Sequence, residues 1–168
     1  MAKIYSYLGI LLILIFMATC KKEVSLNVTN KSAGPLELGQ PISTLSNFFV
    51  PGCLDTVMSK DNHEKFIFVM DEEKRGLRLV YYEGDDLLKE IWVYSDKYLF
   101  DNNLQVGNHY QKFLGNGYTT LRLDKWSTAV TTVVEEYPNL TFYFENKLDS
   151  LGELSLDSKM KCIRILPY

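Results

Sequence analysis

The sequence predicts an α+β domain built mainly on antiparallel sheet, with two short helices. Several short runs are rich in β-branched and aromatic residues and are bounded by turn residues, which is typical of strands. Two other segments, which follow Gly39 and Gly107, carry apolar residues at helical spacing. The expected strands are 65–70, 77–82, 88–94, 121–123, 140–144 and 160–166.

The clearest hairpin joins the runs at 77–82 and 88–94. Between them, Gly84-Asp85-Asp86 supplies residues that tolerate unusual backbone angles, which suits a tight turn. A second turn is predicted at Tyr137-Pro138-Asn139-Leu140, at the start of another expected strand.

The segment 126–136 admits two interpretations. Its apolar residues fall on one face of a helix, at the spacing of an amphipathic segment. The same segment is dense in β-branched residues, which are stiff in helices, and a turn and a strand follow it directly. We therefore favour a strand. The apolar residues concerned are Trp126, Ala129, Val130, Val133 and Val134.

Two stretches of the chain resemble each other. Leu36-Glu37-Leu38-Gly39 and Leu104-Gln105-Val106-Gly107 both end at a glycine, and an amphipathic segment follows each. Pro41 suits the first turn of a helix. The domain would then consist of two related β-α-β-β halves, although a match over so few positions also arises by chance. The residues expected to face the core from the two helices are Ile42, Leu45, Tyr110, Phe113 and Leu114.

The start of the chain has the pattern of an export signal. Lys3 precedes an apolar run of 11 residues, from Leu8 to Ala18. A membrane-spanning helix needs about 20 residues, whereas this run has the length of a signal-peptide core. Ala18 and Thr19 are small, as cleavage by a signal peptidase requires, and Cys20 follows them.

Met17-Ala18-Thr19-Cys20 resembles the lipobox of bacterial lipoproteins, in the looser form found in Bacteroidota. The resemblance implies a signal peptide at 1–19, acylation of Cys20 and attachment to a membrane of the cell envelope. The outer membrane is favoured, on either its periplasmic or its surface face. An ordinary cleaved signal and an uncleaved anchor are the alternatives. Residues 20–34 would form a lipidated tether, and 35–168 a single domain.

A second resemblance lies within the chain. Val106-Gly107 through Leu114-Gly115 is similar to a signature of small outer-membrane lipoproteins of the assembly-accessory type. Asn108 and His109 depart from that pattern directly after the glycine, and the similarity covers a short stretch. The function of that family is therefore not carried over to this chain.

Two cysteines remain after Cys20, namely Cys53 and Cys162. Outside the cytoplasm, two thiols in one small domain tend to pair. We therefore expect a disulfide that joins an early loop to the last strand, with free buried thiols as the alternative. The two residues lack the CxxC spacing and neighbouring histidines of a metal site.

The composition argues against several classes of function. A net charge of −3, with no block of lysine or arginine, disfavours nucleic acid as a partner. No nucleophile, phosphate-loop or dinucleotide motif is present. His63 lies in a polar stretch, and His109 lies at an expected helix start, where free backbone donors could hold an anion. We expect no enzymatic activity, no cofactor and no metal.

Aromatic residues are plentiful in the expected strands. Alternation along a strand places Tyr81 and Tyr82 on opposite faces of the sheet, and Tyr143 opposite Phe142 and Phe144. Exposed tyrosines are favoured at interfaces. Tyr81, Tyr82 and Tyr143 are therefore the predicted partner contacts, unless such tyrosines merely cover a small core.

Together these features predict a lipid-anchored, non-enzymatic binding or accessory module that contacts another envelope protein. A ligand- or glycan-binding surface lipoprotein is the alternative, and a small hydrolase is a third candidate.

Overall fold

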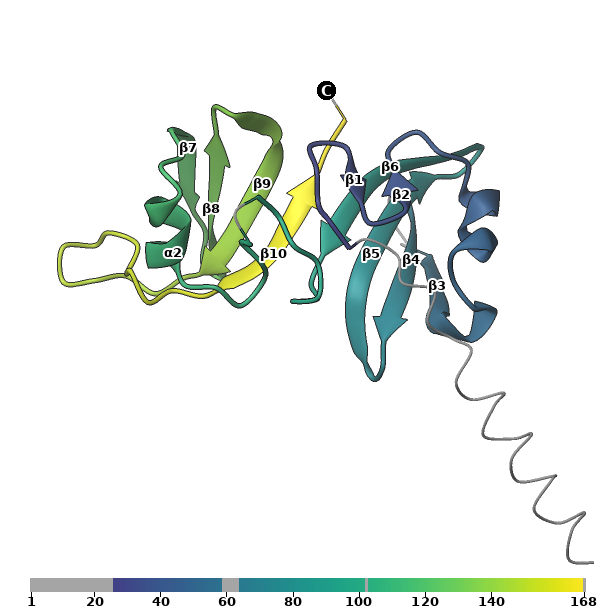
Figure 1. The fold of residues 1–168 in the computed structure, drawn as a ribbon, viewed down its shortest axis with the longest axis horizontal. Helices are drawn as coiled ribbons and strands as arrows, with labels where there is room; N and C mark the ends of the chain where they lie inside the picture. The colour runs from purple at the N-terminus through teal and green to yellow at the C-terminus, as the bar shows by residue number, and fades with distance from the viewer. Residues whose placement is uncertain (1–25, 59–63, 102, 168) are drawn as a thin grey trace, which may run out of the picture.

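A computed structural model describes residues 26–58, 64–101 and 103–167 of the chain (Figure 1). The predicted signal peptide at 1–19, the predicted lipidation site Cys20 and His63 lie outside the described residues. No helix within the described ranges is long and apolar enough to cross a membrane.

An eight-stranded antiparallel sheet forms the framework of the molecule. Its strands are β3 (Leu54–Met58), β4 (Glu64–Asp71), β5 (Lys74–Tyr82), β6 (Asp85–Val93), β7 (Thr120–Lys125), β8 (Ala129–Val134), β9 (Tyr137–Glu145) and β10 (Met160–Ile165). Their order in the sheet is β3-β4-β5-β6-β10-β9-β8-β7. Two four-stranded meanders therefore meet along their last strands, with Val93 opposite Ile163 and Ile91 opposite Ile165 (Figure 1).

The predicted antiparallel sheet is confirmed, and 126–136 contains a strand as favoured. The turn predicted at 137–140 is wrong, because Val134 pairs with Tyr137 and the chain reverses at the two residues between them. Pro138 instead lies near the start of β9. The hydrogen-bond ladder between β8 and β9 is irregular there, so the N–H that proline lacks removes little pairing.

Short helices precede both meanders. The first meander follows two 3₁₀ helices, η1 (Ile42–Asn47) and η2 (Pro51–Cys53), and the second follows α2 (Tyr110–Gly115). Leu45 and Phe113 are buried beneath the sheet as expected, whereas Leu114 is exposed and its predicted core position is wrong. A helix of only six residues turns one narrow face inward, and Leu114 lies outside that face.

The two meanders are attached to the preceding chain in the same way. Gly39 has φ of +83° and Gly107 has φ of +89°, a backbone region that favours glycine. The N–H of Gly39 donates to the carbonyl of Leu88 in β6 (2.7 Å), and the N–H of Gly107 donates to Met160 in β10 (2.8 Å). The N–H of Leu88 in turn donates to the carbonyl of Gln40, and the N–H of Met160 donates to the carbonyl of Asn108. Each half is therefore a short helix followed by four strands, in place of the expected β-α-β-β.

An N-terminal hairpin of β1 (Ser32–Ala33) and β2 (Leu36–Glu37) is part of the packed domain. Val28 is buried, and the N–H of Val28 donates to the carbonyl of Leu99 (2.7 Å). Ala33 and Leu36 are fully buried. The tether predicted at 20–34 is therefore wrong from Leu26 onward, and the described domain begins there, before residue 35.

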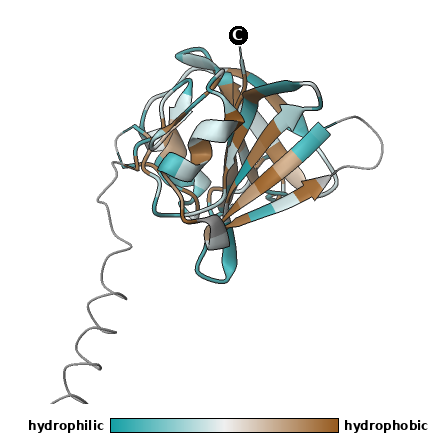
Figure 2. Cartoon of the chain, turned by 90° about the vertical axis from the view of Figure 1, so that its right-hand side faces the viewer, coloured by the Kyte–Doolittle hydropathy of each residue, from teal (hydrophilic) through white to brown (hydrophobic). Residues whose placement is uncertain are grey.

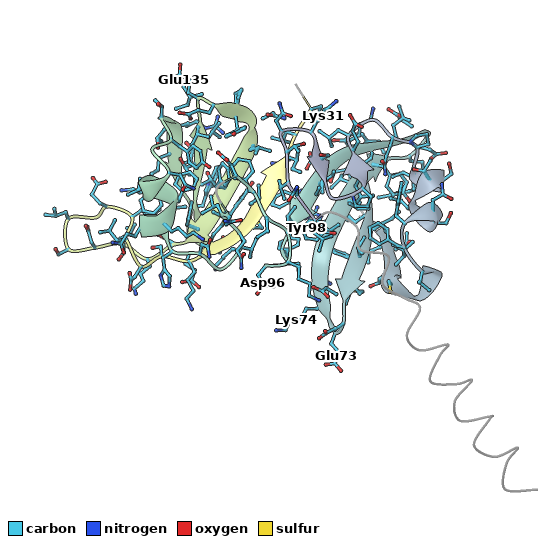
Figure 3. All side chains as sticks on the ribbon, viewed as in Figure 1. Lys31, Glu73, Lys74, Asp96, Tyr98 and Glu135 are labelled. Carbon is cyan, nitrogen blue, oxygen red and sulfur yellow. The ribbon has the colours of Figure 1, made fainter. Side chains whose placement is uncertain are left out.

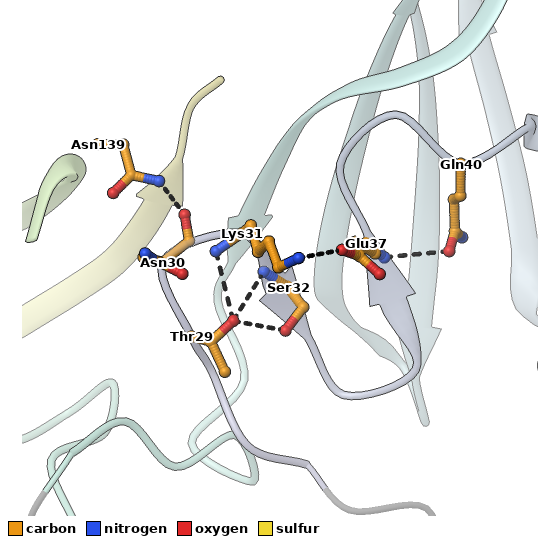
Figure 4. Close-up of polar contacts among 7 residues, drawn as sticks. All are labelled: Thr29, Asn30, Lys31, Ser32, Glu37, Gln40 and Asn139. Carbon is orange, nitrogen blue, oxygen red and sulfur yellow. Dashed lines mark hydrogen bonds and ion pairs between the residues drawn. The ribbon is translucent and has the colours of Figure 1, made fainter. Parts of the chain in front are cut away.

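Polar contacts fasten the hairpin to the rest of the molecule (Figure 4). Thr29 accepts hydrogen bonds from the backbone N–H groups of Lys31 and Ser32. The side chain of Asn139, at the start of β9, donates to the carbonyl of Asn30. The first residues of the domain are thus bound to a strand of the second half.

The two faces of the sheet differ in what covers them. Figure 2 shows helices and connecting loops gathered on one side of the strands. We call this side the inner face, because the core lies between it and the covering elements, and we call the other side the open face. The core includes Ala33, Leu36, Leu45, Ile67, Leu77, Leu79, Ile91, Leu104, Phe113, Leu140, Phe142 and Phe144.

Candidate functional site

The open face carries a row of arginines and aromatic rings at the junction of the two halves. Arg78 in β5 lies opposite Trp92 in β6, and Trp92 lies opposite Arg164 in β10. Cross-strand neighbours share one face of a sheet, so these side chains contact each other. We call this group the Arg–aromatic cluster. It consists of Phe66, Phe68, Arg75, Arg78, Glu90, Trp92, Tyr94, Tyr143 and Arg164.

Cations and rings alternate through the cluster. The guanidinium of Arg78 lies 3.9 Å from the ring centre of Phe66 and 5.3 Å from that of Trp92. Arg164 lies 4.8 Å from the Trp92 ring, and Arg75 lies 4.1 Å from the ring of Phe68. Each such contact contributes about 0.5–1 kcal/mol at an exposed site. The arginines are therefore held in place by rings on their own face.

Arg164 has a carboxylate partner within the cluster. Its Nε and Nη2 donate to the two oxygens of Glu90 at 3.0 and 2.8 Å, a bidentate pair. Burial alone would lower the pKa of Arg164, but the hydrogen bond and charge of Glu90, together with Tyr143, outweigh burial and raise it. Trp92 also donates to Glu90, at 3.1 Å. Glu90 thus fixes the orientation of both Arg164 and Trp92.

Arg78 has no such partner. No carboxylate in the described part of the chain pairs with it, and its buried Nε finds no acceptor among those residues. Arg78 is hydrogen-bonded to the hydroxyl of Tyr94. Among the described residues, this half-buried arginine on the open face therefore has no counter-charge, in contrast to Arg164, which is paired with Glu90.

The predicted partner tyrosines are divided between the two faces. Tyr81 is buried in the core, so its predicted contact with a partner is wrong. Tyr82 is exposed. Tyr143 is half-buried on the open face, with its ring 5.2 Å from that of Trp92. Only Tyr143 belongs to the cluster.

Sequence reasoning missed the arginines. Arg78 and Arg164 each lie between two inward-facing apolar residues, in Leu77-Arg78-Leu79 and Ile163-Arg164-Ile165. A lone cation at the outward position of a central strand is an available signal, because such strands usually carry neutral residues there.

A cleft of about 570 Å³ adjoins one end of the cluster, between the β4–β5 turn and the crossover after β6. Arg75 and Tyr94 line it, and Figure 3 places Lys74, Glu73 and Asp96 around it. The cleft carries charges of both signs.

An ion pair between Asp71 and Lys97 lines this cleft. Asp71 accepts hydrogen bonds from Lys97 and from the hydroxyl of Ser95. Burial raises the pKa of Asp71, but the bonds from Lys97 and Ser95 outweigh burial and hold the pKa below its usual range. The pair ties the β4–β5 turn to the crossover that leads into the second half.

Comparisons with known proteins identify the fold alone. No family model matches the chain, and no curated protein matches it. A solved structure that does match is the crystal structure of the uncharacterized protein yfeY from Escherichia coli. It superposes with a TM-score of 0.64 at 15% identity and covers 84% of this chain and 99% of that one. This chain therefore has the fold of that protein.

The expected disulfide is not formed, because Cys53 and Cys162 are both free thiols. Cys53 directly precedes β3, whereas Cys162 lies in β10, four strand positions away. At about 4.8 Å per strand, the separation is about 19 Å, well beyond the roughly 7 Å that a disulfide spans between Cα atoms. The expectation failed because sequence spacing carries no information on strand order.

The candidate histidine within the described residues is hydrogen-bonded to a neighbouring loop. His109 precedes α2, and its Nδ1 is 2.9 Å from the carbonyl of Asp157, which lies in the loop before β10. Among the described residues, no group of three or more histidine, cysteine or acidic side chains is placed to hold a metal.

Proposed function

We propose that the chain is a lipid-anchored, non-enzymatic module of the cell envelope that contacts another envelope protein through the open face of its sheet. The Arg–aromatic cluster carries this proposal. Tryptophan, tyrosine and arginine are the residues most enriched at the energetic centres of protein interfaces. Here they are gathered on the one face that the helices and the N-terminal hairpin leave uncovered.

The proposed anchor is the lipid on Cys20, supported by the short apolar run and the lipobox-like residues that precede it. Because the domain begins by Leu26, six residues at most, 20–25, separate it from the lipid. Six residues span no more than about 20 Å even when fully extended. The open face would therefore work within a short distance of the membrane surface, favouring a partner in or on that membrane.

We also propose that the two halves arose by duplication. The paired hydrogen bonds of Gly39 and Gly107 support this origin, since they join equivalent residues to the fourth strand of each meander. Leu45 and Phe113 lie at the same distance after these glycines, and both are buried. A partner contacted at the junction would then touch strands from both copies.

Site-specific photocrosslinking in cells tests the protein contact. Val57 is 40% exposed and lies on the open face beside Phe66, whereas Leu114 is 43% exposed on α2 at the opposite side. A photoreactive amino acid at position 57 is expected to give a discrete protein adduct, and the same amino acid at 114 is not. Equal labelling from both positions, or none from 57, contradicts the proposal.

Two further variants test the anchor and the absence of catalysis. Cys20→Ser is expected to move the protein to the soluble fraction and to abolish the adduct at position 57. A combined His63→Ala, His109→Ala variant is expected to retain both the membrane attachment and the adduct. Membrane attachment of Cys20→Ser at high salt would contradict the lipid anchor.

Ligand binding is the second candidate, favoured by a groove of about 550 Å³ beside the N-terminal hairpin. Asn27, Asn30 and Tyr137 line the groove, as does Asp101, which accepts hydrogen bonds from the hydroxyls of Tyr118 and Tyr137. Amide and carboxylate groups beside an aromatic ring suit the hydroxyls of a sugar. A saccharide panel titrated against the wild type and Asp101→Asn tests this: binding lost in the variant would support the groove.

A further inference from the structure

The two central arginines of the open face provide an internal comparison. Both flank the ring of Trp92, Arg78 from β5 and Arg164 from β10. Arg164 is neutralised by the bidentate carboxylate of Glu90. Arg78 lies on the other strand beside Trp92 and has no carboxylate partner in the described part of the chain.

The cluster is positively charged in a chain that is negatively charged as a whole. Its members include three arginines, Arg75, Arg78 and Arg164, and one carboxylate, Glu90. The full chain has a net charge of −3. A local positive charge on an acidic protein makes the cluster complementary to an acidic partner, and such complementarity increases both specificity and association rate.

The guanidinium of Arg78 is positioned by contacts within its own chain. It lies between the rings of Phe66 and Trp92, and Tyr94 is hydrogen-bonded to it. Ordering a flexible cation is one of the costs of binding, and the rings remove most of that cost beforehand. A planar guanidinium held in this way is suited to bidentate pairing with a carboxylate.

We propose that the Arg–aromatic cluster binds a carboxylate side chain presented by the partner protein, with Arg78 as the pairing residue. The proposal rests on the protein contact proposed above and specifies its chemistry. Phe66 and Trp92 form the apolar walls on either side of the ion pair. A membrane of anionic lipid fits less well, because polybasic lipid-binding segments use clusters of about 4–8 lysines and arginines.

A fluorescence and NMR titration of the full mature chain tests this proposal. The protein carries Cys20→Ser to remove the lipid and Trp126→Phe, so that Trp92 is the only tryptophan. The probes are the acetylated, amidated peptide with five Ala-Glu repeats and its twin with five Ala-Gln repeats. Inorganic phosphate and vesicles of anionic phospholipid form two further arms.

The glutamate peptide is expected to change the emission of Trp92 and to bind about tenfold more tightly than the glutamine twin. Arg78→Gln should remove that preference, and Arg78→Lys should reduce it, because lysine keeps the charge but loses the planar pairing. Arg122→Gln is the matched control. Arg122 is also a strand arginine of this sheet, but it is already paired with Asp124 at 2.7 Å.

Three outcomes of the titration overturn the proposal. They are equal binding of the two peptides, equal effects of Arg78→Gln and Arg122→Gln, and a response to phosphate or vesicles without one to the glutamate peptide. The photocrosslink at Val57 separates this proposal from the one it rests on. If Arg78→Gln leaves that adduct intact, the protein contact stands and its carboxylate chemistry is wrong.

Discussion

The two halves of the sheet share one scaffold but place their aromatic rings on opposite faces. In the second half most rings lie in the core, with Tyr143 as an exception; there the ring centre of Phe113 is 5.0 Å from that of Phe142 and 5.4 Å from that of Phe144. In the first half the core is largely aliphatic, with Tyr81 as an exception. The rings of that half line the open face, namely Phe66, Phe68, Trp92 and Tyr94.

The two placements of the aromatic rings have different consequences for the molecule. Rings packed inside the second half exclude water and stabilise the fold. On the open face of the first half Phe68 is buried, whereas Phe66, Trp92 and Tyr94 are only partly buried, and these rings are interleaved with arginines outside the core cluster. On the same scaffold, the open face of the second half carries mainly small or neutral residues, such as Thr131, Val133 and Thr141. The first half and the junction are therefore the expected contact region.

The largest expected difference between the halves is in thiol reactivity. Burial raises the pKa of Cys162 to about 12, although the nearby cations of Arg164, Lys161 and Arg78 oppose that rise. At pH 8 the reactive thiolate of Cys162 is then about a thousandfold scarcer than in a solvated thiol. Cys53 is half-buried. Labelling of folded Cys20→Ser protein with a thiol reagent should modify Cys53 first and Cys162 only after unfolding.

This labelling also tests the absence of the disulfide. Mass spectrometry of unreduced protein after complete unfolding should find two modified cysteines. A linked peptide containing Cys53 and Cys162 would contradict the described strand order.

Core truncation should show the next largest difference. Phe113 and Leu45 occupy equivalent positions after Gly107 and Gly39, and both are at most 2% exposed. Phe113→Ala should lower the free energy of unfolding by about 3–5 kcal/mol, and Leu45→Ala by about 2–4 kcal/mol. Trp92→Ala, on the half-buried open face, should cost about 1–2 kcal/mol. Urea unfolding of the three variants checks this order, which fails if Trp92→Ala is the most damaging.

The two turn glycines should respond alike. An added Cβ meets nothing within 4 Å at either Gly39 or Gly107, so backbone strain at positive φ is the remaining cost. Gly39→Ala and Gly107→Ala should each destabilise by about 1–2 kcal/mol. Gly115→Ala is the control, because it is equally open but has no positive φ. Unequal losses at the two glycines would argue against equivalent halves.

The sequence predicts those parts of the fold that depend on neighbouring residues in the chain. The alternation of β4, β5 and β6 is local, so those strands were predictable. β3 was missed because it is an edge strand with several exposed side chains and lacks a clear apolar alternation. The similarity of Leu36–Gly39 to Leu104–Gly107 did mark equivalent structures, although the halves begin with a helix.

The site depended on information that no local pattern carries. Arg78, Trp92 and Arg164 come from three strands, and only the order β5-β6-β10 brings them together. The same order separates Cys53 from Cys162. The burial of 26–34 was likewise not predictable from its polar composition. Its polar residues are hydrogen-bonded to each other and to Asn139, whereas Val28 and Ala33 lie in the core.

The smallest expected effect concerns the ion pairs that tie a loop to each half. In the first half, Asp71 accepts from Lys97 and Ser95, and in the second half Asp157 accepts from Lys147. The side chain of Asp71 is 29% exposed and that of Asp157 is 55% exposed. Exposed pairs are screened by water and contribute little. Asp71→Asn should therefore cost about 1 kcal/mol at pH 7, and Asp157→Asn should cost less.

The pH dependence identifies the source of that loss. The pKa of Asp71 is lowered in the folded state, so its contribution is complete above the unfolded pKa of about 4. It disappears as the pH falls through the lower folded value. The stability difference between wild type and Asp71→Asn, measured by urea unfolding, should be present at pH 7 and should shrink progressively as the pH falls below about 4. A difference that stays constant with pH would mean that Asp71 acts through packing and not through its charge.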